Sequence, residues 1–181
     1  MTREEARQIL HELTETESLL RHARSIELVM EAYAKKLGED PDEWAIAGML
    51  HDADYEKHPD RHPEIIAKIL REKGEDKIAN AIAAHYTKWN RPYNTLLDKA
   101  LIASDELTGF IIACTHVRPD KINNLAPKSV VKKLKDKRFA AKVEREEVSK
   151  GIELFGVDRN EHIRFIIDVL KENKEELRIA P

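Results

Sequence analysis

Hydrophobic residues recur at steps of three and four along nearly the whole chain, which is the spacing of helices that bury one face. The longest regular run predicts one helix over residues 16–37, which Gly38 is placed to end. Asp40 and Pro41 then fit the cap and the first residue of another helix. No segment shows the strict alternation of a half-buried strand, so we expect an all-α fold.

The same pattern predicts further helices over residues 43–52, 63–73, 75–85, 95–114, 129–135, 145–155 and 158–173. The helix over 43–52 is hydrophobic on nearly every side and should lie at the centre of the fold. Two stretches, 54–62 and 86–94, lack a helical pattern, and each directly follows a histidine of interest. Irregular segments beside rigid helices often carry functional groups.

Length and composition fit one folded domain. The chain has 181 residues, of which 41% are hydrophobic and 36% charged, so it can bury a sizeable core and remain well solvated. We therefore expect a single domain over residues 1–181, in which helices over about 128–175 complete a bundle begun by residues 15–115. The net charge of −3 argues against a dedicated nucleic-acid-binding protein.

Cysteine content and the chain's ends narrow the class of protein further. Cys114 is the single cysteine, which excludes an internal disulfide and a cysteine-based zinc site. The charged N-terminus lacks the hydrophobic region of a signal peptide, and no hydrophobic stretch approaches the ~18 residues that a membrane span needs. We expect a cytoplasmic protein without a membrane anchor, and its oligomeric state stays open.

Three predicted helices each place a histidine or an aspartate among hydrophobic residues. His22 lies on the hydrophobic face of the first long helix, and His51 and Asp52 close the most hydrophobic helix. Asp105 interrupts a later hydrophobic run. Each has an ordinary explanation when taken alone: a core histidine with one hydrogen bond, an aspartate that caps the next turn, or an aspartate paired with an arginine.

A metal ion would explain these four residues together, because it compensates buried carboxylates and orients imidazoles. Two histidines and two aspartates form a mixed set of nitrogen and oxygen ligands. Such a set suits Mn²⁺, Fe²⁺, Co²⁺, Ni²⁺, Zn²⁺ or Mg²⁺, with water completing the coordination.

At these residues the sequence resembles the HD-domain superfamily of metal-dependent phosphohydrolases. The family pattern has a histidine on an early helix, a His-Asp doublet that ends a central helix, and an aspartate on a later long helix. It is matched here by His22, His51-Asp52 and Asp105, over about residues 15–115. The resemblance implies an HD-domain-like helical bundle and a phosphohydrolase that depends on a divalent metal.

Two further histidines extend the resemblance to family members with two metal ions. His62 precedes a proline that begins a helix, and His85 ends the next predicted helix. The resemblance implies a second ion held by His62 and His85, with Asp52 as the bridge. The alternative is that His62 is an ordinary loop histidine, and His58, also followed by proline, is a weaker rival because no amphipathic helix follows it.

The sequence departs from the family pattern after two of these histidines. Ala53-Asp54 stands where Ile-Gly often follows the doublet, and Tyr86-Thr-Lys-Trp follows His85 in place of a second histidine and a glutamate. A Gly-Tyr-Pro signature is also missing. These departures argue against a cyclic-dinucleotide phosphodiesterase, and the chain resembles small stand-alone HD hydrolases instead.

The resemblance further implies hydrolysis by water that the metal activates, with Asp52 inside the catalytic centre. Asp54 and Glu56 lie just beyond the doublet and are candidates for moving protons, although each taken singly is better explained as a solvated loop charge. A small phosphorylated substrate, including a nucleotide, also needs positive charge beyond the metal. Our candidates for binding it are Arg24, Lys57, Arg91, Arg118 and Lys128.

Two other functions fit the same residues. HD-type di-iron oxygenases use a similar set of six ligands, and this chain has a candidate for each: His22, His51, Asp52, His62, His85 and Asp105. A non-catalytic HD module that binds a nucleotide or a protein partner is the other alternative. The identity of the bound metal would distinguish an oxygenase from a hydrolase, and the absence of any bound metal would favour the binding module.

Overall fold

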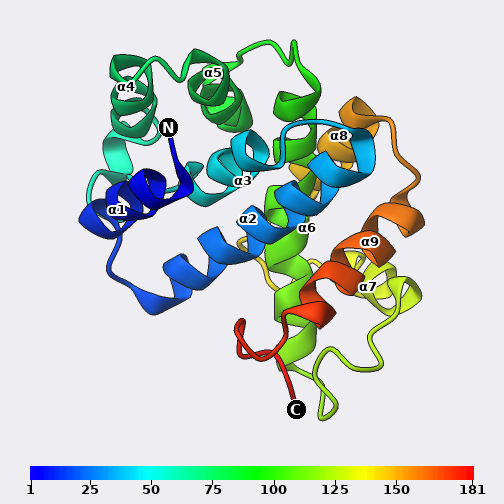
Figure 1. The fold of residues 1–181 in the computed structure, drawn as a ribbon. Coiled ribbons are helices and arrows are strands. Elements are labelled where there is room, and N and C mark those ends of the chain that lie inside the picture. The colour runs from blue at the N-terminus through cyan, green and yellow to red at the C-terminus, as the bar shows by residue number, and fades with distance from the viewer. The chain divides into compact units, whose positions relative to one another are not determined.

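The computed structural model describes residues 1–181, and all of its regular secondary structure is helical (Figure 1). The predicted all-α fold is therefore confirmed. The chain divides into two compact units, residues 1–101 and 102–181, with the boundary inside helix α6 (Leu96–His116). The expectation that both units form a single domain stays a prediction. No helix is long and hydrophobic enough to cross a lipid bilayer.

The first unit holds five helices before α6. They are α1 (Arg3–Leu13), α2 (Glu17–Leu37), α3 (Pro41–Leu50), α4 (Glu64–Glu72) and α5 (Asp76–His85). Two short 3₁₀ helices, η1 (Pro59–Arg61) and η2 (Thr87–Trp89), lie in the stretches that lacked a helical pattern. In Figure 1, α3 lies against α2, and α4 lies beside α5. Helices α2 to α5 begin and end within a few residues of the predicted bounds.

Helix α1 was not predicted, although the sequence carries a signal for it. The Thr2 hydroxyl accepts a hydrogen bond from the Glu5 N–H, and the Glu5 carboxylate accepts one from the Thr2 N–H. This reciprocal pair is a capping box, which satisfies two N–H groups at a helix start. Ala6, Ile9 and Leu10 then bury one face of the helix.

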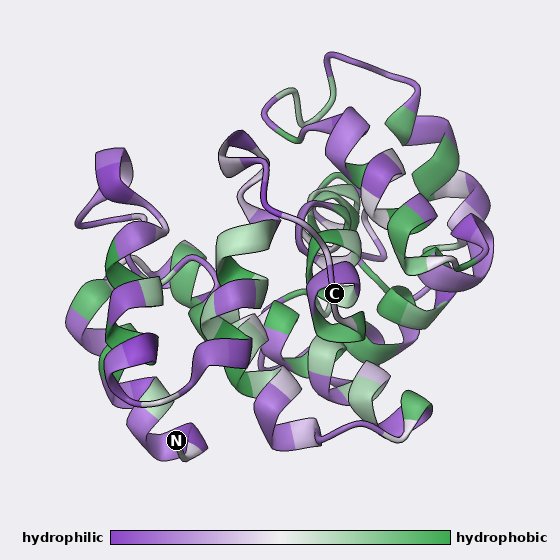
Figure 2. Cartoon of the chain, turned by 90° about the horizontal axis from the view of Figure 1, so that it is seen from above, coloured by the Kyte–Doolittle hydropathy of each residue, from purple (hydrophilic) through white to green (hydrophobic).

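Helix α3 is the centre of the first unit, as its sequence predicted. Its residues from Trp44 to Leu50 are all buried. The Asp40 carboxylate caps the helix by accepting from the N–H groups of Asp42 and Glu43. Helices such as α1 and α4 instead bury one face, and Figure 2 shows hydrophobic and hydrophilic residues along the helices of the chain.

A glycine allows α3 to cross α2 closely. A Cβ atom placed on Gly48 would lie 2.7 Å from the carbonyl oxygen of Ile26, closer than such contacts occur in proteins. The backbones of α2 and α3 therefore meet at this point. His22 lies one turn before Ile26, and His51 lies one turn after Gly48. The crossing thus determines how close these two histidines come.

The second unit contains the rest of α6, α7 (Pro127–Leu134), α8 (Arg145–Phe155) and α9 (Arg159–Glu172). Gly151 of α8 packs against the backbone of Ala103 on α6. The buried His162 of α9 donates from Nε2 to the Ala103 carbonyl at 2.8 Å. His162 is therefore a core histidine whose polar ring is satisfied within the unit.

Candidate metal centre

Two imidazoles and one carboxylate meet where α2 crosses the end of α3. The Nε2 atoms of His22 and His51 are 3.1 Å apart. Asp52 Oδ2 lies 3.4 Å from His51 Nε2 and 3.9 Å from His22 Nε2. His51 is fully buried, whereas the Asp52 side chain is 29% exposed, so solvent reaches the cluster from the carboxylate side.

The other oxygen of Asp52 faces a second pair of histidines. Its Oδ1 atom lies 3.3 Å from Nε2 of His62 and 3.4 Å from Nε2 of His85. His62 precedes α4 and His85 ends α5, and both side chains are buried. The Asp52 carboxylate therefore lies between two pairs of imidazoles, one on each oxygen.

Hydrogen bonds on the other ring nitrogen hold the imidazoles of His51, His62 and His85. His51 Nδ1–H donates to the Gly48 carbonyl at 2.8 Å, and His85 Nδ1–H donates to the Ile82 carbonyl at 2.5 Å. His62 Nδ1–H donates to Asp54 Oδ1 at 2.7 Å. Because a carbonyl oxygen only accepts, the proton of a neutral ring lies on Nδ1, and the lone pair of Nε2 points toward Asp52.

This arrangement fits divalent metal ions. Four Nε2 atoms surround one carboxylate at distances of 3.3 to 3.9 Å. Neutral imidazoles fixed in this tautomer have no Nε2 proton to give to the carboxylate, and four protonated imidazoles this close would repel one another. Cations between the nitrogen and oxygen atoms satisfy both kinds of ligand, and hydrogen bonds on Nδ1 are the usual support of metal-binding histidines.

The surroundings keep Asp52 ionised. Burial alone would raise the pKa of its carboxyl group, but the charge and hydrogen bonds of His51 and His85 in their protonated form hold the pKa well below its ordinary value, and a cation bound in place of those protons acts in the same direction. Asp52 is therefore a carboxylate at neutral pH, which is the form that binds a cation.

Asp54 supports the cluster instead of moving protons in solvent. Its side chain is completely buried, and Oδ1 accepts from His62 while Oδ2 accepts from the Ile66 N–H at 2.9 Å. Both oxygens are thus engaged, one by a candidate ligand and the other by the first turn of α4. The alternative that Asp54 is a solvated loop charge is therefore wrong, and its two hydrogen bonds give it a positioning role.

Glu56 is also engaged, but away from the cluster. Its carboxylate accepts from the Thr16 hydroxyl at 2.6 Å and from the N–H groups of Glu15 and Thr16. These bonds lower the pKa of Glu56, the Thr16 hydroxyl most of all. The residue therefore caps the start of α2, and the structure gives no support to its predicted role in moving protons.

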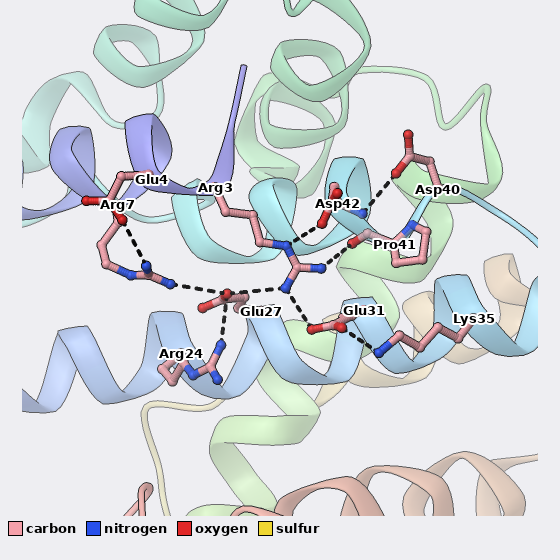
Figure 3. A network of polar contacts seen from close by, with 10 residues as sticks. All are labelled: Arg3, Glu4, Arg7, Arg24, Glu27, Glu31, Lys35, Asp40, Pro41 and Asp42. Atoms are coloured by element: carbon pink, nitrogen blue, oxygen red, sulfur yellow. Dashed lines mark hydrogen bonds and ion pairs between the residues drawn. The ribbon is translucent and has the colours of Figure 1, made fainter.

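Two of the predicted phosphate-binding residues of the first unit form ion pairs with carboxylates of the chain. Arg24 pairs with the buried Glu27 at 2.8 Å, and Arg3 and Arg7 reach the same carboxylate (Figure 3). Lys57 donates to the Glu12 carbonyl at 2.7 Å and pairs with Glu15. Arg24 thus pairs within α2, whereas Lys57 joins the segment after α3 to the end of α1. Their roles in substrate binding stay predictions.

The remaining candidate of the first unit is Arg91, whose guanidinium lies 5.9 Å from the ring centre of Trp89. Arg118 and Lys128 belong to the second unit. Arg118 pairs with Asp120 and donates to the Asn124 carbonyl, and Lys128 is exposed at the start of α7. Their roles in substrate binding stay predictions.

Asp105 also belongs to the second unit, on α6, and its part in binding a metal stays a prediction. Of the two histidines in the loop that were candidates for the second ion, the cluster contains His62 and not His58.

The residues that our sequence analysis missed are aromatic. Tyr55 and Tyr86 both lie edge-to-face with His62, with ring centres 5.6 and 5.2 Å away. For Tyr86, the sequence carried one indication, because this residue begins the segment that departs from the family pattern. For Tyr55 it carried none.

A comparison with known protein families agrees with this geometry. The family model described as the HD domain matches residues 19–109, just over half of the chain. That span contains every residue of the clusters around Asp52. No curated protein and no solved structure matches the chain. The chain therefore belongs to the HD-domain family.

Proposed function

We propose that this protein is a metal-dependent phosphohydrolase that cleaves a phosphate monoester or diester of a nucleotide or another small metabolite. HD domains generally mark metal-dependent phosphohydrolases. The observation that carries the proposal is the Asp52 carboxylate, which faces two histidine nitrogens with each of its oxygens. A carboxylate placed in this way can bridge two cations.

The proposal assigns the ligands to two ions. His22, His51 and Asp52 hold the first ion, and the family resemblance adds Asp105 as a further ligand. Asp52, His62 and His85 hold the second ion. The nitrogen and oxygen ligands suit Mn²⁺, Fe²⁺, Co²⁺, Ni²⁺ or Zn²⁺, and Mg²⁺ where water completes the coordination.

When bound, a divalent ion at this place lowers the pKa of water and polarises a phosphoryl oxygen. The chain's own residues prepare the site for that chemistry. Asp52 stays ionised because of its low pKa. His51, His62 and His85 are buried, and their Nδ1 hydrogen bonds hold the rings with Nε2 toward Asp52. Asp54 holds His62 in place.

The first experiment measures the metal content of protein purified without added metal, followed by phosphate release from a panel of phosphate esters. We expect bound transition metal and turnover that His51→Ala and Asp52→Ala abolish while helical content stays the same. His58→Ala is the matched control, because this histidine lies in the same loop but outside the cluster. Full activity in both ligand variants would refute the proposal.

The second candidate function is that of a di-iron oxygenase, and the number of histidines is the observation that supports it. Four imidazoles around one carboxylate form a nitrogen-rich set that also suits iron. Iron in the purified protein, together with oxygen consumption and no phosphate release, would support a di-iron oxygenase. Phosphate release from Mn²⁺- or Co²⁺-loaded protein would exclude it.

A further inference from the structure

Three aromatic rings extend outward from a histidine of the candidate centre. Tyr55 and Tyr86 both lie edge-to-face with His62, and Tyr86 contacts Trp89 with ring centres 6.1 Å apart. We call Tyr55, Tyr86 and Trp89 the aromatic rim. The rings come from two irregular segments, one after α3 and the other after α5.

The rim is open to solvent, which is unusual for such large hydrophobic rings. The Tyr55 side chain is 50% exposed, one of four large hydrophobic residues exposed in this way, and Tyr86 and Trp89 are half-buried. A ring that only filled the core would be covered. Exposed aromatic rings beside a polar cluster are instead typical of a surface that binds a ligand.

Two exposed cations accompany the rings. The Lys88 ammonium lies 5.5 Å from the ring centre of Tyr86, and the Arg91 guanidinium lies 5.9 Å from that of Trp89. Neither cation forms an ion pair with a carboxylate in the structure, so both charges remain available to an anion. Rings with cations beside them match a ligand that has a flat ring and a negative charge.

The backbone holds Trp89 in a tight turn. Asn90, which follows it, has a φ of 48° in the left-handed region, and its N–H donates to the Thr87 carbonyl. Asparagine adopts this conformation more readily than most other residues, so the turn forms without strain. The turn fixes the Trp89 ring at the outer end of the rim.

We infer that the aromatic rim binds the flat ring of the substrate's leaving group, so that the substrate is a phosphate ester of a nucleoside or of another planar aromatic alcohol. The inference rests on the proposed phosphohydrolase function. The phosphate lies toward the Asp52 cluster, the ring stacks on the rim, and the positive charges of Lys88 and Arg91 beside the rim attract the anionic substrate. Stacking on aromatic side chains tolerates different bases, because every base has a flat face.

The chain carries its own probe for ring binding. It has two tryptophans, and Trp44 is fully buried in α3, so Trp89 is the one whose fluorescence a surface ligand can reach. We expect adenosine and cytidine, which lack a phosphate, to quench the fluorescence, and ribose to leave it unchanged. Trp89→Phe should remove the quenching, because Trp44 alone remains. No quenching of the wild-type chain by either nucleoside would overturn the inference.

Kinetics supply the second measurement. We expect Trp89→Ala to raise KM for nucleoside monophosphates about tenfold and to leave kcat/KM for ribose 5-phosphate unchanged. Trp89→Phe, which keeps a ring, should restore most of the loss. Leu37→Ala is the control for removing an exposed hydrophobic side chain elsewhere in the same unit. An equal effect of Trp89→Ala on both substrates would overturn the inference.

The two measurements separate this inference from the proposed function. Quenching by nucleosides without any phosphate release would leave the rim as a ring-binding site and reject the hydrolase. Phosphate release from ribose 5-phosphate without nucleoside quenching would support the hydrolase and reject the rim. Phenyl phosphate distinguishes the two classes of substrate that have a flat ring. A higher kcat/KM for phenyl phosphate than for nucleotides would identify a simple aryl ester as the substrate. A higher kcat/KM for nucleotides would identify a nucleoside phosphate.

Discussion

At the scale of single residues, the orientation of His62 depends on one buried carboxylate. Asp54 accepts from His62 Nδ1–H with one oxygen and from the Ile66 N–H with the other. Asp54→Asn leaves one acceptor oxygen for two donors, so one of them loses its partner. We expect the affinity for the ion held by His62 to fall about 10- to 100-fold, the usual effect of removing such a support. Calorimetric titration with Mn²⁺ or Zn²⁺ measures it.

Asp60→Asn is the matched control, since Asp60 is an exposed aspartate of the same loop. It should bind metal as the wild-type chain does. Wild-type affinity for both ions in Asp54→Asn would show that the Asp54 bond has no part in holding the metal ligand.

Glu56 illustrates how a carboxylate beside the site stabilises the fold without joining the chemistry. Its pKa is lowered in the folded state by bonds from Thr16 and Glu15. The stabilisation is therefore present above the unfolded pKa of about 4.3 and is lost as the pH falls through the lower folded value. We expect Glu56→Gln to unfold at lower urea concentration than the wild-type chain at neutral pH, with the difference shrinking in acid and kcat unchanged.

Urea unfolding at several pH values and a parallel measurement of kcat test this role of Glu56. A large fall in kcat with unchanged stability would return Glu56 to the proton-moving role that its place in the sequence first indicated. Glu15→Gln serves as the control, because the Glu15 side chain pairs with Lys57 and makes no bond to the helix start.

At the scale of helices, the α2–α3 crossing sets the distance between His22 and His51. A Cβ at Gly48 would meet the Ile26 carbonyl oxygen at 2.7 Å, and the backbone would have to move. We expect Gly48→Ala to lower the free energy of unfolding by about 1–3 kcal/mol and to weaken metal binding, because the helix shift separates the two imidazoles.

Gly74→Ala separates this effect from a general loss of stability. Gly74 has a φ of 80°, with open space where a Cβ would lie. Alanine there costs about 1–2 kcal/mol through backbone strain alone, so metal affinity should stay unchanged. Urea unfolding and metal titration of both variants decide the matter. Equal metal affinities in the two variants would show that the close crossing does not position the ligands.

The helices could be predicted from the sequence because a period of 3.6 residues is a local signal. The bounds of α2 and α8 follow from their hydrophobic faces and from the glycines that end them, Gly38 and Gly156. Helix α1 was missed because its hydrophobic face is short. Its capping box, Thr2 with Glu5, was the stronger signal.

The directions of charged side chains could not be predicted in the same way. Lys57 donates to a carbonyl 45 positions away, and Arg24 pairs with Glu27, whose carboxylate Arg3 and Arg7 of α1 also approach. The partner of each charged side chain depends on which segments pack together, and a single sequence does not reveal this packing. The candidate ligands were predictable because the family resemblance supplied their spatial relation, whereas the aromatic rim had no such guide.

At the scale of the whole molecule, metal binding should contribute to stability. An ion that binds only the folded chain stabilises it by about 2.7 kcal/mol when its free concentration is 100 times Kd. The candidate ligands are separated by many residues, from His22 to His85 within the first unit. We therefore expect a chelator to lower the melting temperature of the wild-type chain, and His85→Ala to keep part of that shift because it removes a ligand of only one ion.

Asp105 is the predicted ligand that lies in the second unit, so its substitution tests whether that unit takes part in metal binding. We expect Asp105→Asn to weaken the ion held by His22 and His51 and to reduce the melting-temperature shift that metal produces. Glu106→Gln is the matched control, because this neighbour on α6 accepts from the Glu144 N–H within its own unit. It should keep the full shift. If Asp105→Asn bound two ions with wild-type affinity, Asp105 would not be a metal ligand, and the residues of the first unit alone would hold both ions.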